Sequence, residues 1–252
     1  ARAGEDKGAL IAALSGHSVA RIFSGARGDL RALAGELLEL SVEVGDWWTI
    51  AALGGGMAGG MSRLDPAGAE AILKTAVGAA RRTGNPYAIA MTSMAEGRMF
   101  SMKRQVDEAR AWLEEAIARF AELGDERLVL AVKSELAHAV RRAGLLDEAM
   151  GRYRETMPGW VRFGNRGAIA HQLENIAFLL IERGESLRAA SLLGTAEVLR
   201  ETLASPMLEP EQAEHDEWIA RLRGAEGAPA IDSASSDGRA MPMLDAVALA
   251  TR

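Results

Sequence analysis

Apolar residues recur at steps of three and four along most of this chain, which is the spacing of one face of an α-helix. Over 106–123, charged residues occupy the opposite face, and the apolar stripe is Val106, Ala109, Leu113, Ala116, Ile117, Phe120 and Leu123. The stripe over 126–142 is equivalent and consists of Leu128, Val132, Leu136, Ala139 and Val140. No stretch of useful length alternates with period two, and no Asn-Gly hairpin turn occurs. The pattern therefore predicts an all-α protein.

A glycine followed by Asp or Asn separates these helices at intervals of 39, 40 and 40 residues. The pairs are Gly45-Asp46, Gly84-Asn85, Gly124-Asp125 and Gly164-Asn165. Glycine just past a helix end can adopt the left-handed conformation, and the Asp or Asn can accept from the first free N–H groups of the next helix. A fixed period near 40 is typical of a solenoid of stacked helix pairs.

A second series of short breaks divides each period into a helix A and a helix B. Helix B begins at Val106, Leu146 and Ser186, and a small alanine follows at Ala109, Ala149 and Ala189. The spacing predicts five antiparallel helix pairs, with the break of the first pair at Gly25 to Gly28. The five predicted pairs occupy 5–43, 46–83, 86–123, 126–163 and 166–203, so the repeat array covers 1–205.

The end of the chain departs from the repeat. Residues 206–223 are predicted to form a polar helix that caps the array, since terminal repeats of solenoids are usually atypical. Residues 224–240 are rich in Gly, Ala, Ser and Asp and predict a loop or disorder. We therefore expect 224–252 to be a flexible tail, with one possible short helix from Pro242 to Ala250.

Five glycines (Gly54, Gly55, Gly56, Gly59 and Gly60) lie inside helix A of the second pair. A phosphate-binding loop would end in Gly-Lys-Ser or Gly-Lys-Thr after a strand, whereas Met61-Ser62-Arg63 follows here. Close packing of this helix on its neighbours, or a locally weak helix, is the favoured interpretation.

Composition and charge argue against two classes of function, namely nucleic-acid binding and spanning a membrane. The net charge is −6, arginine is interleaved with Asp and Glu, and no single-signed basic face is visible, so we expect no direct nucleic-acid binding. Apolar runs are far shorter than about 20 residues, which predicts no membrane span. The absence of cysteine fits a reducing cytoplasm. The chain begins with Ala1, so we expect it to be a piece of a larger protein or a processed product.

No constellation of residues predicts chemistry. The four histidines form no His-x-x-x-His or His-Glu-x-x-His pair, and no Gly-x-Ser-x-Gly elbow occurs. We expect no metal, no cofactor and no enzymatic activity.

A stacked-pair solenoid does offer a concave groove lined by its A helices. Methionine is an adaptable contact residue, and arginine and aromatic residues are common binding anchors. The predicted groove for an effector or partner protein is Met91, Met94, Arg98, Met102, His138, Arg141, His171, Glu174 and Phe178. The alternative is that these are ordinary helix-surface residues.

The repeats resemble tetratricopeptide (TPR) repeats of roughly 40 residues, in a superhelical solenoid. The runs GNRGAIA at 164–170, RAASLLGTAEVLRE at 188–201 and GRAMPMLDAVALA at 238–250 are similar to the C-terminal TPR region of large bacterial regulators. In that group a STAND-class ATPase is followed by TPRs, often with a LuxR-type or SARP-type DNA-binding domain or an adenylate-cyclase-like domain. The resemblance departs at Ile231, Ser235 and Ser236, where relatives carry an aromatic, alanine-rich helix.

The resemblance implies a non-enzymatic cytoplasmic sensor module of a bacterial transcriptional regulator, which receives an effector or partner protein and controls the ATPase. The ATPase and the DNA-binding domain would then belong only to a larger parent protein. The alternative is a free-standing TPR scaffold that recruits a partner protein and has no link to transcription.

Overall fold

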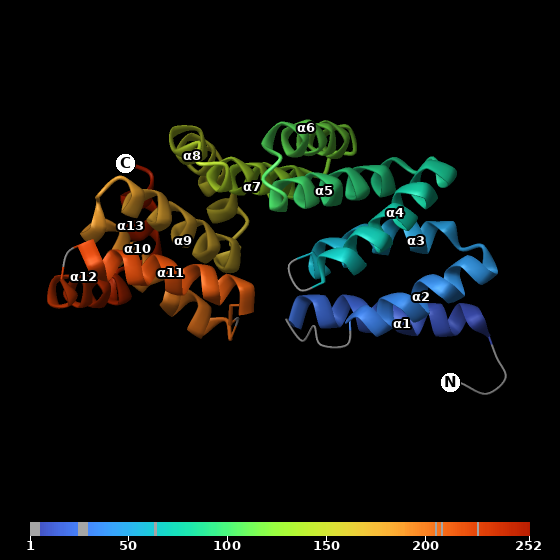
Figure 1. Cartoon of the computed structure of the whole chain (residues 1–252), viewed down its shortest axis with the longest axis horizontal. Helices are drawn as coiled ribbons and strands as arrows, with labels where there is room; N and C mark the ends of the chain where they lie inside the picture. Colours follow the sequence, from blue (N-terminus) through green and yellow to red (C-terminus); the bar gives the residue numbers. More distant parts are fainter. Residues whose placement is uncertain (1–5, 25–29, 63–64, 205, 208, 226) are drawn as a thin grey trace. The chain divides into compact units, whose positions relative to one another are not determined.

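The described residues of the computed structural model, 6–24, 30–62, 65–204, 206–207, 209–225 and 227–252, form thirteen α-helices and no strand (Figure 1). The prediction of an all-α chain is therefore confirmed. The predicted break from Gly25 to Gly28 lies outside the described residues. The chain divides into two compact units, Ala1–Glu135 and Leu136–Arg252, with the division inside α7. Within the described ranges, no helix has both the length and the apolar content needed to cross a bilayer.

The first unit, Ala1–Glu135, contains six helices and the first part of a seventh among its described residues. They are α1 (Lys7–Ser24), α2 (Leu30–Val44), α3 (Trp47–Met61), α4 (Pro66–Thr83), α5 (Pro86–Met102), α6 (Val106–Glu122) and α7 (Glu126–Arg142). Helix α3 packs against α4 and α5, and each helix from α1 to α5 contacts the next one in sequence.

The Gly-Asp and Gly-Asn junctions have the predicted conformation. The φ angles of Gly45, Gly84, Gly124 and Gly164 are 73°, 62°, 72° and 63°. The side chain that follows each glycine accepts a hydrogen bond from a backbone N–H three residues on. These bonds join Asp46 to Thr49 N (3.0 Å), Asn85 to Ala88 N (3.1 Å), Asp125 to Leu128 N (2.9 Å) and Asn165 to Ala168 N (3.1 Å). Two residues end one helix and begin the next, as predicted.

The glycines of α3 allow close packing, which confirms the favoured interpretation of that run. A Cβ at Gly54 would lie 2.7 Å from the Cβ of Ala76 in α4. A Cβ at Gly55 would lie 3.2 Å from the carbonyl oxygen of Met91 in α5. Any larger residue at Gly54 would force α3 and α4 apart, because real Cβ atoms do not approach so closely.

The second unit, Leu136–Arg252, begins with the last part of α7 and continues through six more helices in its described residues. They are α8 (Leu146–Arg162), α9 (Arg166–Glu182), α10 (Ser186–Thr202), α11 (Glu209–Ala225), α12 (Ala228–Ala240) and α13 (Met243–Ala250). Helix α9 packs against α8 and α10, and both α12 and α13 pack on α10.

The prediction of a loop or disorder over 224–240 is wrong, because 228–240 form the helix α12. The cause is a close approach of two backbones. A Cβ at Gly238 would lie 2.0 Å from the carbonyl oxygen of Ser191, and a Cβ at Gly194 would lie 2.2 Å from that of Ser235. With a glycine on each helix, α10 and α12 meet closely, and Ile231 is buried. Tertiary contact therefore stabilises a helix whose own composition is poor for one.

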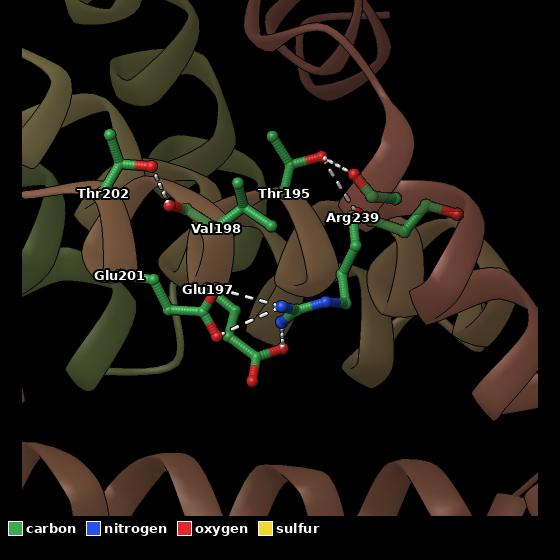
Figure 2. A network of polar contacts seen from close by, with 8 residues as sticks. Thr195, Glu197, Val198, Glu201, Thr202 and Arg239 are labelled. Atoms are coloured by element: carbon green, nitrogen blue, oxygen red, sulfur yellow. Dashed lines mark hydrogen bonds and ion pairs between the residues drawn. The ribbon is translucent and has the colours of Figure 1, made fainter.

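Polar contacts fix the end of α12 on α10 (Figure 2). The Thr195 hydroxyl donates to the carbonyl oxygen of Gly238 at 2.7 Å. The Arg239 guanidinium reaches Glu197 at 2.7 Å and Glu201 at 2.9 Å. Hydrogen bonds to Glu201 and Glu197 raise the pKa of Arg239 above its ordinary value. The segment with the least helical composition is therefore tied to its neighbour by both packing and charge.

Candidate functional site

The nine residues predicted to line a groove divide between the two units. Four lie on α5 in the first unit, namely Met91, Met94, Arg98 and Met102. Five lie on α7 and α9 in the second unit, namely His138, Arg141, His171, Glu174 and Phe178. That any of them binds a partner stays a prediction.

In the first unit, Arg98 is held by protein groups on both sides. A Cβ at Gly59 of α3 would lie 2.8 Å from Nη1 of Arg98, so the glycine leaves room for the guanidinium. Arg98 also forms an ion pair with Glu135 of α7. Met94 is buried, and Met91 and Met102 are half-buried. These α5 side chains are largely engaged in packing within the unit.

In the second unit, the structure brings the predicted residues together on one side of α7 and α9, which we call the α7–α9 face. The rings of His138 and His171 have centroids 4.5 Å apart. His138 is only 4% exposed, and its Nδ1 is hydrogen-bonded to the hydroxyl of Tyr153 at 2.7 Å. Tyr153 of α8 is fully buried. The histidine ring therefore has a fixed orientation between three helices.

Arg141 lies beside these histidines and carries a charge with little access to water. Its side chain is 6% exposed, and its guanidinium carbon lies 5.4 Å from the centroid of the Phe178 ring. One guanidinium nitrogen donates to the carboxylate of Glu214 at 2.5 Å. Its Nε is buried and has no hydrogen-bond partner among the described residues. A buried arginine with an unused N–H is a strong potential donor to an anionic group.

Glu174 is the negative counterpart on α9 and is 3% exposed. Arg200 of α10 donates to both of its carboxylate oxygens, at 2.5 and 2.8 Å. Burial opposes the charge of Arg200, but its hydrogen bond to Glu174 and the negative charges of Glu174 and Glu211 raise its pKa above the ordinary value. Glu174 is therefore paired with a cation of α10, whereas the partner of Arg141 comes from α11.

Helix α11 lies against the α7–α9 face, beside α9 (Figure 1). The rings of Phe178 and Trp218 are stacked, and the ring of His215 meets Phe178 edge-on at 6.3 Å. Arg221 donates to Glu182 at 3.2 Å. Three of the residues that define the contact, Glu214, Trp218 and Arg221, follow one another at steps of four and three.

Sequence reasoning identified 206–223 as a cap but did not place it on the predicted groove. The signal was the spacing of Glu214, Trp218 and Arg221, which puts them on one side of a helix. That side carries the groups that meet the α7–α9 face, namely a carboxylate at Arg141 and an aromatic ring on Phe178. Only Leu222 of α11 is buried among the residues whose side chains are described.

The face offers charge pairing and aromatic stacking. In the part of the chain that the structure describes, no group of three or more His, Asp and Glu side chains is placed to hold a metal ion. The buried polar groups of the face also contact α8, α10 and α11, through Tyr153, Arg200 and Glu214.

Neither comparison by sequence identifies the chain: no family model matches it, and no curated protein is significantly similar to it.

Proposed function

We propose that this chain is a non-enzymatic helical-repeat module of the TPR type, and that its α7–α9 face binds a partner helix. One observation carries the proposal: α11 already lies on this face through the pairs Arg141–Glu214, Phe178–Trp218 and Glu182–Arg221. An amphipathic helix held by an anchoring ring and flanking charges is a common mode of peptide recognition. Helix α11 is then an internal ligand of the α7–α9 face.

The contacts of α11 define the chemistry of the partner. The partner helix would carry a carboxylate and an aromatic residue four positions later, as Glu214 and Trp218 do. A partner that also accepts a hydrogen bond from Nε of Arg141 would bind better than α11 does, because a buried donor without a partner costs about 1–3 kcal/mol. Helix α11 contributes little buried apolar surface, so such a partner can replace it.

The wider setting of the proposal comes from the resemblance to the regulators with a STAND-class ATPase. A cytoplasmic sensor in a bacterial transcriptional regulator would use replacement of α11 to report the presence of its partner. A free-standing TPR scaffold would use the same face only to recruit. The coding sequence upstream of Ala1 separates these two roles, since an ATPase domain there favours the sensor.

The test uses the full chain and a fluorescent peptide of residues 209–225. The double variant Glu214→Ala, Trp218→Ala weakens the chain's own α11, so the labelled peptide should bind it at least about tenfold more tightly than it binds wild type. A peptide in which Trp218 is replaced by alanine should bind at least about tenfold more weakly. Fluorescence anisotropy measures both affinities.

The control variant is Trp48→Ala, because Trp48 is 56% exposed and lies on α3 in the first unit. It should leave peptide binding at the wild-type level. If the double variant folds and does not bind the peptide, the α7–α9 face is not a site for helices.

A further inference from the structure

A cleft of about 510 Å³ lies between α4 and α5 in the first unit, whereas the α7–α9 face belongs to the second unit. Its volume is within the range of about 300–1,000 Å³ that is usual for small-molecule sites. We call it the α4–α5 cleft. Its lining consists of Glu70, Leu73, Lys74, Val77, Gly78 and Arg81 from α4, with Glu96, Met99 and Phe100 from α5 and Lys103 just after it.

The lining residues form one stripe on each helix. On α4 they follow steps of three, one, three, one and three, and on α5 steps of three, one and three. Such spacing keeps side chains on a single face. From Glu70 to Arg81 the stripe is about 16 Å long at 1.5 Å per residue. The cleft is therefore an elongated channel between two facing helices.

Its middle is apolar. Leu73 and Met99 are 5% and 6% exposed and form part of the core, while Val77 and Phe100 are half-buried at the surface of the cleft. Four apolar side chains in one elongated floor favour an extended apolar chain or a flat ring system.

The charges lie at the ends and along the α4 side. At one end Lys103 donates to both carboxylate oxygens of Glu70 at 3.1 Å. Arg81 and Glu96 interact at the other end. Lys74 is exposed on the α4 side.

The cleft has more positive than negative side chains, since its lining holds three cations (Lys74, Arg81 and Lys103) and two carboxylates. Burial raises the pKa of the Glu96 carboxyl, Arg81 acts to lower it, and Glu115 of α6 adds to the increase. With Glu70 bound to Lys103, Lys74 and Arg81 give the cleft an excess of positive charge.

We propose that the α4–α5 cleft binds an amphipathic organic acid, with its apolar chain over Leu73, Val77, Met99 and Phe100 and its carboxylate at Lys74 and Arg81. This site is separate from the proposed helix-binding face. The module then has a place for a small effector in one unit and a place for a partner helix in the other.

Gly78 provides a variant that fills the cleft without disturbing the fold. It lines the cleft, is exposed, and a Cβ there would contact no protein atom within 4 Å. Gly78→Leu therefore places an isobutyl group in open space and replaces a glycine inside a helix, which favours the helix. Gly151→Leu is the matched control, since Gly151 is also an exposed glycine inside a helix with open space around its Cβ.

The experiment titrates the full chain with decanoate and with decylammonium, which share a chain length and differ in the sign of the head group. Isothermal titration calorimetry should show decanoate binding about tenfold more tightly than decylammonium. Gly78→Leu should weaken decanoate binding about tenfold, and Gly151→Leu should leave it unchanged. The double variant Lys74→Gln, Arg81→Gln should remove the preference for the anion.

Three results would overturn the proposal. Decylammonium could bind as tightly as decanoate, decanoate could fail to bind at all, or Gly78→Leu could bind decanoate as wild type does. Circular dichroism of Gly78→Leu checks that the helices remain intact.

Discussion

The ring of Trp218 lies on the ring of Phe178, with centroids 5.3 Å apart and planes 12° from parallel. Phe178 belongs to α9 and Trp218 to α11, so the contact joins the repeat helices to the helix that follows them. Arg221 lies over the Trp218 ring at 4.6 Å. The stack, with a cation on the same indole ring, anchors a helix that buries little else.

Trp218→Ala should loosen α11 more than any other part of the second unit. Loss of the stack should cost about 1–2 kcal/mol of the free energy that holds α11 in place, because aromatic pairs contribute beyond their buried area. Amide hydrogen exchange should become faster over 209–225 and stay slow in α9. Trp48→Ala is the control, and equal exchange over 209–225 in wild type and Trp218→Ala would contradict the prediction.

Gly124→Val should destabilise the first unit by about 1–3 kcal/mol, since a β-branched residue is strained in the left-handed region. The φ of Gly124 is 72°, and a Cβ there would contact no atom within 4 Å. The loss is therefore one of backbone strain rather than crowding. Gly124→Asn should lose less of the free energy of unfolding, because asparagine tolerates the left-handed conformation. Urea unfolding midpoints measure both, and equal midpoints for wild type and the valine variant would show that the junction carries no strain.

Gly238→Ala should detach α12 from α10. The new Cβ would lie 2.0 Å from the carbonyl oxygen of Ser191, so the two backbones must separate, at a cost of about 1–3 kcal/mol. Limited proteolysis should then cut within 228–240 in the variant much earlier than in wild type. Gly224→Ala is the control, because its Cβ has open space. Cleavage of wild type in α12 at the same rate as the variant would argue against the packing of α10 on α12.

Glu96→Gln should stabilise the chain at neutral pH and have little effect in acid. Burial raises the pKa of Glu96, so the folded chain binds this proton more tightly than the unfolded chain does. The contribution of Glu96 to stability therefore falls as the pH rises from the ordinary carboxyl pKa through the raised one. Glutamine does not titrate, so it removes this pH-dependent loss of stability. The gain in free energy of unfolding over wild type should therefore grow between pH 4 and pH 7.

Urea melts at several pH values measure this gain. Glu122→Gln, at an exposed position near the end of α6, provides the comparison. A gain of Glu96→Gln that is the same at pH 4 and pH 7 would contradict the assigned effect of burial.

The helix junctions could be predicted from sequence because their chemistry is local. A glycine and the next polar side chain determine one left-handed residue and one cap, whatever the rest of the fold does. The close packing at Gly54 was predictable for a related reason, since a glycine inside a helix with no ligand motif is most simply explained by a neighbouring helix.

Helix α12 could not be predicted because its stability is not local. Ser235 and Gly238 are poor helix formers, and the contacts that hold them come from Ser191 and Gly194 in α10. The position of α11 was missed for the opposite reason. Its polar surface resembled a solvated face, whereas Glu214 meets a buried arginine. The α4–α5 cleft left a readable pattern in its two stripes, but only tertiary structure shows that the stripes face each other.

The connections of α11 determine how hard it is to replace. At one end, residues 203–208 connect α11 to α10. The other end continues into α12, which is fixed on α10 by Gly238 and Arg239. A displaced α11 therefore stays tethered at both ends and keeps an effective concentration on the order of millimolar at the face it has left. A free partner at micromolar concentration must bind about a thousandfold more tightly than α11 to occupy half of the molecules. The lengths of two short connections would thus determine the partner concentration to which the module responds.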